Sequence, residues 1–229
     1  LSLLSNSGLT ADKQIVLNDT LEEKYADNSL QMAESTDVSP SSGKEFFQKC
    51  IVAAVFAAIV LILYIAIRFK NIGGWLAGIC AVIALFHDII VVYGTFVIFG
   101  MEIDANFMAV ILTILGYSIN DTIVIYDRIR ENKTLYKDKL SLAELTNLST
   151  NQSLTRSINT SVTTIATMLV VTIVAMVYGV NSIISFSFPM MIGLISGTYS
   201  TICIAGPLWV WLEEKKNGGN SPKAEAAAE

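Results

Sequence analysis

The chain has 229 residues, of which 53% are hydrophobic and 15% charged, and this balance excludes a typical soluble domain, in which about a quarter of the residues are charged. Its formal net charge of −5 identifies no partner, because charge in a membrane protein has to be read loop by loop. Its three cysteines, Cys50, Cys80 and Cys203, lie in apolar runs without the spacing of a disulfide framework or a metal site. We therefore expect an integral membrane protein without a cofactor or bound metal.

Residues 1–49 are polar and mixed in character. Residues 14–17 are compatible with a strand or with part of a helix, and residues 29–34 alternate apolar and polar side chains as a half-buried strand does. A turn-rich linker follows at 37–43. Because so short a segment buries little core alone, we expect the remnant of a small α+β extracytoplasmic domain whose earlier part precedes Leu1.

Five stretches are apolar and long enough to cross a bilayer, since about 20 helical residues span its hydrocarbon core. We expect an all-α polytopic membrane protein with one bundle at residues 50–212 and spans at 50–67, 75–99, 106–126, 158–178 and 184–212. Pro189 is expected to interrupt and kink the last span. Gly193 and Gly197, four residues apart in that span, predict a face for close helix packing.

Two polar segments follow the third and fifth spans. Residues 128–157 are expected to form a loop that contains a short helix at 140–145, with Ser141 as its N-cap and Glu144 three residues later. Residues 213–229 are charged and then rich in Gly, Ser, Pro and Ala, which predicts a disordered tail.

The distribution of Lys and Arg predicts the orientation in the membrane. Six lie in residues 128–157, three in the tail and two in residues 68–74, whereas the turns at 100–105 and 180–182 have none. Because positive residues favour the cytoplasmic side, we expect the tail in the cytoplasm and the N-terminal segment outside.

The third span carries a carboxylate, Asp121. An ionised Asp near the centre of a membrane helix costs roughly 2.5–3.5 kcal/mol, so a helix that only anchored the chain would have an apolar residue there. Thr113, Tyr117 and Asp121 are four residues apart and share one face, with Gly116 and Asn120 beside them. Asp121 is therefore a candidate functional site, or it pairs with a neighbouring helix and only holds the bundle together.

Arg156 precedes the fourth span, and Thr160, Thr163 and Thr167 continue its helical face. This row of threonines would hydrate a path through the membrane, or it is ordinary helix packing. Arg156 could reach Asp121 in at least one conformation. A guanidinium nearby favours the ionised carboxylate, and its withdrawal favours the protonated form. The alternative is a basic residue whose side chain only extends to the membrane surface.

The second span carries an adjacent pair, His87 and Asp88, whose side chains point about 100° apart on a helix. The pair is either a second proton-relay site or an internal hydrogen-bonded lock.

At the membrane edge, Asp127 is expected to pair with Arg128, Arg130 or a helix end. The chain has no Walker, nucleophile-elbow, zinc or dinucleotide motif, so we do not expect an enzyme.

Residues 116–132, Gly-Tyr-Ser-Ile-Asn-Asp-Thr-Ile-Val-Ile-Tyr-Asp-Arg-Ile-Arg-Glu-Asn, resemble the signature of the SecF family. These proteins are the smaller membrane subunits of the bacterial SecD–SecF export complex, within the resistance–nodulation–division superfamily. His87-Asp88, the acidic turn at 102–104 and Arg156 with Ser157 are also similar. The resemblance covers about residues 29–212.

The resemblance implies six spans in a full family member, with an external domain after the first, so that this chain would lack the first span. It implies a bacterial cytoplasmic-membrane protein that uses the proton-motive force to assist preprotein export. The implied partners are SecD, the SecYEG channel, SecA and YidC, with no nucleic acid. A scaffold without ion flux and a small-molecule exporter remain alternatives, and Na⁺ remains an alternative to the proton.

The same resemblance ties two residues to proton flow, Asp121 and Arg156, with a further acid supplied by SecD. The supporting residues that we select around them are Asn120, Tyr117, Gly116, His87, Asp88 and Thr160.

Overall fold

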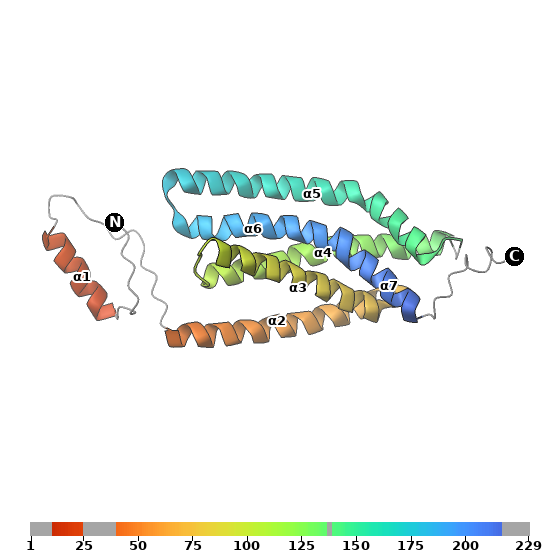
Figure 1. The fold of residues 1–229 in the computed structure, drawn as a ribbon, viewed down its shortest axis with the longest axis horizontal. Helices are drawn as coiled ribbons and strands as arrows, with labels where there is room; N and C mark the ends of the chain where they lie inside the picture. The colour runs from red at the N-terminus through yellow and green to blue at the C-terminus, as the bar shows by residue number, and fades with distance from the viewer. Residues whose placement is uncertain (1–10, 25–39, 137–138, 217–229) are drawn as a thin grey trace. The chain divides into compact units, whose positions relative to one another are not determined.

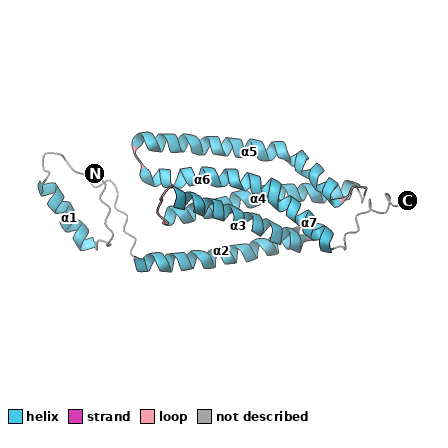
Figure 2. Cartoon of the chain, viewed as in Figure 1, coloured by secondary structure: helices cyan, strands magenta, loops and turns pink. Residues whose placement is uncertain are grey.

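The computed structural model describes residues 11–24, 40–136 and 139–216, and the regular structure within these ranges is helical (Figures 1 and 2). The chain divides into two units, residues 1–53 and 54–229. The first unit contains α1 (Ala11–Lys24), so residues 14–17 are helical rather than a strand. The strand expected at 29–34 lies outside the described residues.

Five membrane-length helical segments are found among the described residues, which confirms the predicted number of spans. The first is the apolar part of α2 (Pro40–Arg68), which is linked through the short 3₁₀ helix Lys70–Ile72 to α3 (Gly74–Ile98). The others are α4 (Ala105–Tyr136), α5 (Leu142–Tyr178) and a last segment made of α6 (Asn181–Ser200), a π-helical turn (Thr201–Ala205) and α7 (Gly206–Lys216).

The expected loop at 128–157 is wrong, because most of it is helical: α4 continues to Tyr136 and α5 already begins at Leu142. Polar contacts join the two extensions, since Asn132 Nδ2 donates to Ser149 Oγ and to Gln152 Oε1, both at 2.8 Å. The predicted N-cap is confirmed. Ser141 Oγ accepts from the Glu144 N–H at 3.2 Å, and the Glu144 carboxylate accepts from the Ser141 N–H at 3.0 Å, a capping box.

The interruption expected at Pro189 is also wrong, because Pro189 lies inside α6, which continues to Ser200. Neighbouring helices and local adjustments let membrane helices tolerate an internal proline. The helical hydrogen-bond pattern changes instead at the π-helical turn Thr201–Ala205, just before Pro207, whose missing N–H cannot continue the pattern.

Helix α6 packs against α3, α4 and α5 at the centre of the bundle (Figure 1). The close approach depends on the predicted glycine face. A Cβ added at Gly193 would overlap the Ile114 side chain, and one added at Gly197 would lie 3.3 Å from Ser118 Cβ. Lipid provides no hydrophobic drive between helices, so such contacts between small residues carry much of their association.

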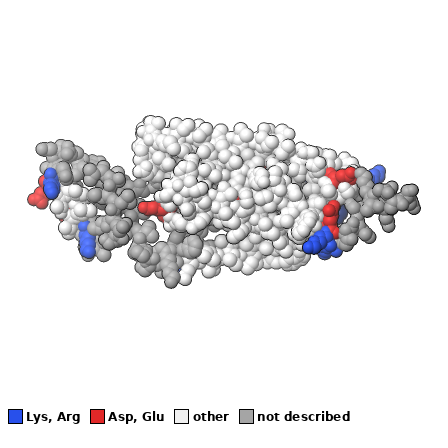
Figure 3. All heavy atoms as spheres, in the orientation of Figure 1, with Lys and Arg blue, Asp and Glu red and all other residues white. Residues whose placement is uncertain are grey.

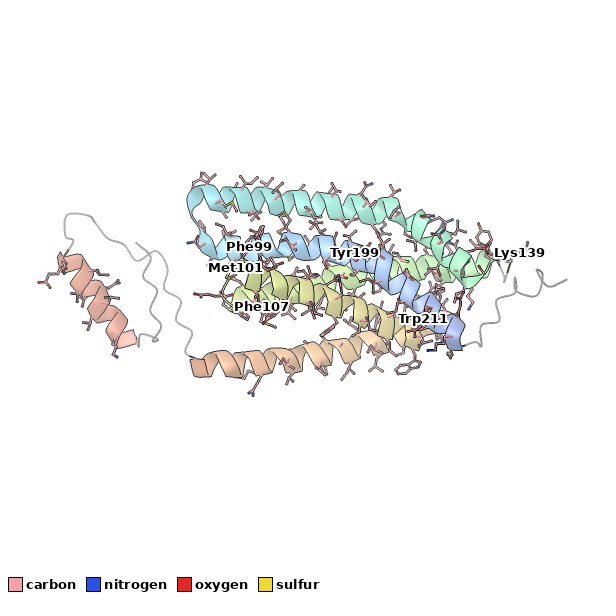
Figure 4. The ribbon with its side chains drawn as sticks, in the orientation of Figure 1. Phe99, Met101, Phe107, Lys139, Tyr199 and Trp211 are labelled. Atoms are coloured by element: carbon pink, nitrogen blue, oxygen red, sulfur yellow. The ribbon has the colours of Figure 1, made fainter. Side chains whose placement is uncertain are left out.

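The two ends of the bundle differ in their side chains. Phe99, Met101 and Phe107 lie near one end, and Lys139 and Trp211 near the other (Figure 4). Charged side chains gather at the ends of the bundle, and its middle shows none on the face drawn in Figure 3. Apolar flanks and charged ends are the distribution that a bilayer requires.

The packing at Gly193 predicts that Gly193→Ala destabilises the protein, by about 1–3 kcal/mol for overpacking. Gly94→Ala is the matched control within α3, because a Cβ there would meet nothing within 4 Å and alanine favours a helix by about 1 kcal/mol. Thermal unfolding of the purified protein in detergent measures both. Equal melting temperatures for the two variants would contradict the close packing.

Candidate functional site

Asp121 lies on α4 with its carboxylate turned toward α5. Its Oδ1 accepts a hydrogen bond from Ser157 Oγ at 2.6 Å, whereas its buried Oδ2 has no hydrogen-bond partner among the described residues. An ionised carboxylate offers about four acceptor positions. Asp121 is therefore only partly satisfied, and a proton or a donor from another molecule would complete it.

Arg156 comes directly before Ser157 on α5, and its side chain is exposed. It makes no ion pair with Asp121 within the described part of the chain, but it neighbours Ser157, which donates to the Asp121 carboxylate. The structure thus brings the two predicted residues to one place and leaves them unpaired. The sequence analysis did not identify Ser157 as the direct partner of Asp121. Its place next to Arg156, a residue already expected near Asp121, could have indicated it.

Most of the other predicted residues near Asp121 are exposed on α4 and α5. Gly116 and Asn120 on α4 are exposed, as is Thr160 on α5, while Tyr117 OH donates to Ser161 Oγ at 3.2 Å. We use the name α4–α5 polar face for the exposed residues of α4 and α5 that the sequence singled out. They are Thr113, Gly116, Asn120, Arg156, Thr160, Thr163 and Thr167.

The hydroxyls of Thr160, Thr163 and Thr167 on α5 bond to carbonyls of their own helix. Thr160 donates to the Arg156 carbonyl and Thr167 to the Thr163 carbonyl, each at 2.9 Å. Thr160, Thr163 and Thr167 are also exposed, so this row does not pack against the described helices of this chain. The Asn120 side chain has no hydrogen-bond partner among the described residues, and an exposed amide without a partner is costly in hydrocarbon.

The structure does not bring His87 and Asp88 to the α4–α5 polar face. Asp88 on α3 is fully buried and bonds to serines of α4 and α6, namely Ser118, Ser196 and Ser200. His87 lies beside it, with its ring 6.0 Å from that of Tyr199, which Figure 4 places halfway along α6 and α7. The three serines were not recognised as Asp88 partners from the sequence, since serines carry no distinctive spacing signal.

At the basic end of the bundle, Asp127 pairs with Arg68 Nη2 at 3.1 Å and Arg130 Nη2 at 2.7 Å. The predicted pairing with Arg130 is confirmed, and Arg68 on α2 was not expected. Arg128 instead pairs with Glu131 at 2.6 Å.

The chain matches the family model described as "Protein export membrane protein SecD/SecF, C-terminal" over residues 17–215. It is 38% identical over 205 residues to "Protein translocase subunit SecF" of Petrotoga mobilis, covering 90% of this chain and 65% of that protein. It is 39% identical over 175 residues to "Protein translocase subunit SecDF" of Bacillus subtilis, covering 76% of this chain and 23% of that protein. The chain thus spans just under two thirds of the SecF relative.

Solved structures are similar as well. The crystal structure of SecDF, a translocon-associated membrane protein from Thermus thermophilus, superposes with a TM-score of 0.73 at 31% identity, covering 90% of this chain and 27% of that chain. A second SecDF crystal structure, in a super-membrane-facing form, has a TM-score of 0.68 at 29% identity and covers 96% of this chain and 28% of that chain.

Proposed function

The chain belongs to the SecD/SecF family of protein-export membrane proteins, and we propose that it is part of a SecF-type translocase subunit that uses the proton-motive force to assist preprotein export across the bacterial cytoplasmic membrane. The observation that carries this proposal is the partly satisfied carboxylate of Asp121 inside a membrane span. A translocation subunit of this kind performs no covalent chemistry on its substrate, so we propose that it is not an enzyme.

The energetics support a role for a single titrating carboxylate. One elementary charge that crosses 100 mV releases about 2.3 kcal/mol. This exceeds the approximately 1.4 kcal/mol that changes a two-state population tenfold. One proton per cycle therefore suffices to bias an external domain between two positions.

A proton fits Asp121 better than Na⁺ does. Na⁺ would require several oxygen ligands, and Ser118, Thr122 and Asn120 are the nearby candidates. Ser118 Oγ donates to Asp88, however, and Thr122 Oγ1 donates to the Ser118 carbonyl. Ser118 and Thr122 are thus directed toward Asp88 and Thr201, whereas the Asp121 carboxylate is directed toward Ser157 of α5. The coupling ion that these contacts favour is the proton, with Arg156 as the charge that biases its release.

We infer that the α4–α5 polar face is where SecD docks and supplies a further acid near Asp121. Asn120, Gly116 and Thr160 lie exposed on this face, and a protein partner would satisfy them where lipid does not. SecYEG, SecA and YidC would associate with the resulting complex. The Lys and Arg distribution supports a cytoplasmic tail and an N-terminal segment outside the membrane.

The decisive variant is Asp121→Asn, which keeps the size of the side chain and removes its titration. We expect proton flux and export stimulation by the complete SecD–SecF complex in vesicles to fall to background, while the complex still co-purifies. Asp127→Asn is the matched control on the same helix, because Asp127 is paired at the bundle end, and it should retain most activity. If SecD no longer co-purifies with the Asp121→Asn variant, the carboxylate holds the complex together and the protein is a scaffold.

The docking face gives a second prediction. A nitroxide label at Asn120→Cys, in a protein whose Cys50, Cys80 and Cys203 are replaced by Ala, should become immobilised when SecD is present, because it would lie in the interface. A label at Ile90→Cys, on the outer side of α3 and 54% exposed, should keep its mobility. Electron paramagnetic resonance spectra in lipid measure both, and unchanged mobility at residue 120 would exclude docking there.

A further inference from the structure

Asp88 is the most completely satisfied ionisable group in the described part of the membrane bundle. Its side chain is 0% exposed. Oδ1 lies 2.7 Å from Ser196 Oγ and 3.2 Å from His87 Nδ1. Oδ2 lies 2.9 Å from Ser118 Oγ and 2.8 Å from Ser200 Oγ. The four acceptor positions of a carboxylate are thereby filled.

An ionised Asp88 accepts hydrogen bonds from all four groups at once. A protonated Asp88 would instead need one hydroxyl to turn and accept its O–H. Within the described residues, His87 is the one other titratable group that contacts Asp88, since α4 and α6 supply hydroxyls. His87 Nδ1 lies 3.2 Å from Asp88 Oδ1, and 37% of the His87 side chain is exposed.

The donors around Asp88 come from two further helices, so the carboxylate joins three helices at one point. Ser118 belongs to α4, and Ser196 and Ser200 belong to α6. Gly197 lies between these two serines, where an added Cβ would be 3.7 Å from Asp88 Oδ2. A neighbouring bond repeats the connection of α4 and α6, because Thr122 Oγ1 lies 3.0 Å from Thr201 Oγ1.

Ser118 is three residues before Asp121, within one turn of α4. The Asp88 hydrogen bond therefore fixes the turn that presents Asp121 toward α5. Asp121 itself has a donor on one oxygen and no partner on the other among the described residues. The two membrane acids thus differ in their hydrogen bonding. Both oxygens of Asp88 have partners, whereas only one oxygen of Asp121 has a partner among the described residues.

We propose that Asp88 is a positioning residue, which holds the Asp121 turn of α4 against α3 and α6 through Ser118, and that it does not exchange protons during the cycle. This inference rests on the proposed function, because it assigns a role relative to the Asp121 proton site. Of the two interpretations that the sequence left open for His87 and Asp88, it selects the hydrogen-bonded lock over the second relay.

The first test compares Asp88→Asn with Asp88→Leu in the complete complex. Asparagine retains one acceptor oxygen for Ser196 and His87, and its NH₂ can donate to the hydroxyls of Ser118 and Ser200. Asp88→Asn should keep proton flux within about threefold of wild type, with an unchanged pH profile. Asp88→Leu removes every hydrogen bond and should lower flux by at least about tenfold, while SecD still co-purifies.

A second pair of variants remains informative if Asp88→Leu does not fold. Ser118→Ala and Ser196→Ala each remove one buried donor to Asp88, but Ser118 alone is on the Asp121 helix. Both should lower the melting temperature by a similar amount. Ser118→Ala should reduce flux at least about threefold more than Ser196→Ala, and equal losses of flux would overturn the positioning role.

Asp121→Asn, measured in the same vesicles, separates the failure of this inference from the failure of the proposed function. If Asp121→Asn and Asp88→Asn both abolish flux in intact complexes, Asp88 exchanges protons and the positioning role is wrong, while the proposed function stands. If Asp121→Asn leaves flux unchanged, the proposed function fails, and the positioning role that depends on it fails too.

Discussion

The interior of a bilayer cannot solvate a carboxylate, so each acid within a span needs donors, a counter-charge or a proton. The two acids of this bundle, Asp88 and Asp121, meet that requirement in different ways. Asp88 receives three hydroxyls and a histidine and joins α3, α4 and α6. Asp121 receives one hydroxyl and remains incomplete. The remaining buried side chains of the bundle are mostly apolar and provide the packing that holds these acids in place.

Helix α6 makes this division possible, because small residues let it approach its neighbours closely. Gly193 and Gly197 face Ile114 and Ser118 of α4, and Thr198 Oγ1 lies 2.6 Å from Ser161 Oγ of α5. In lipid, close packing and hydroxyl bonds replace the hydrophobic effect as the main attraction between helices. The hydroxyls of Ser196, Thr198 and Ser200 lie on the same stretch of α6 as these glycines, so packing and polar satisfaction depend on neighbouring positions.

Features that depend on a short stretch of sequence could be predicted from the sequence alone. The span count follows from hydrophobic length, and the Ser141 cap follows from its spacing to Glu144. The functional role of Asp121, inferred from the cost of an acid in a membrane helix, stays a prediction. The sequence-based prediction failed at 128–157, because a charged stretch has the composition of a loop and its helices are joined by residues distant in sequence, such as Asn132 and Ser149. The serine partners of Asp88 are 30 to 112 residues away, and no local pattern predicts them.

The unequal satisfaction of the two acids has a mechanical consequence under the proposed function. Protonation of Asp121 changes its bond with Ser157, and therefore acts first at the contact of α4 with α5. The contacts of α4 with α3 and α6 involve Asp88 and its serines, which that proton does not reach. A movement driven at Asp121 would then begin at the contact of α4 with α5 and at any partner on the α4–α5 polar face, while Asp88 holds α4 to α3 and α6. Proton binding at Asp121 would therefore affect α5 and a bound partner rather than α3, because α4 is held to α3 and α6 through Asp88.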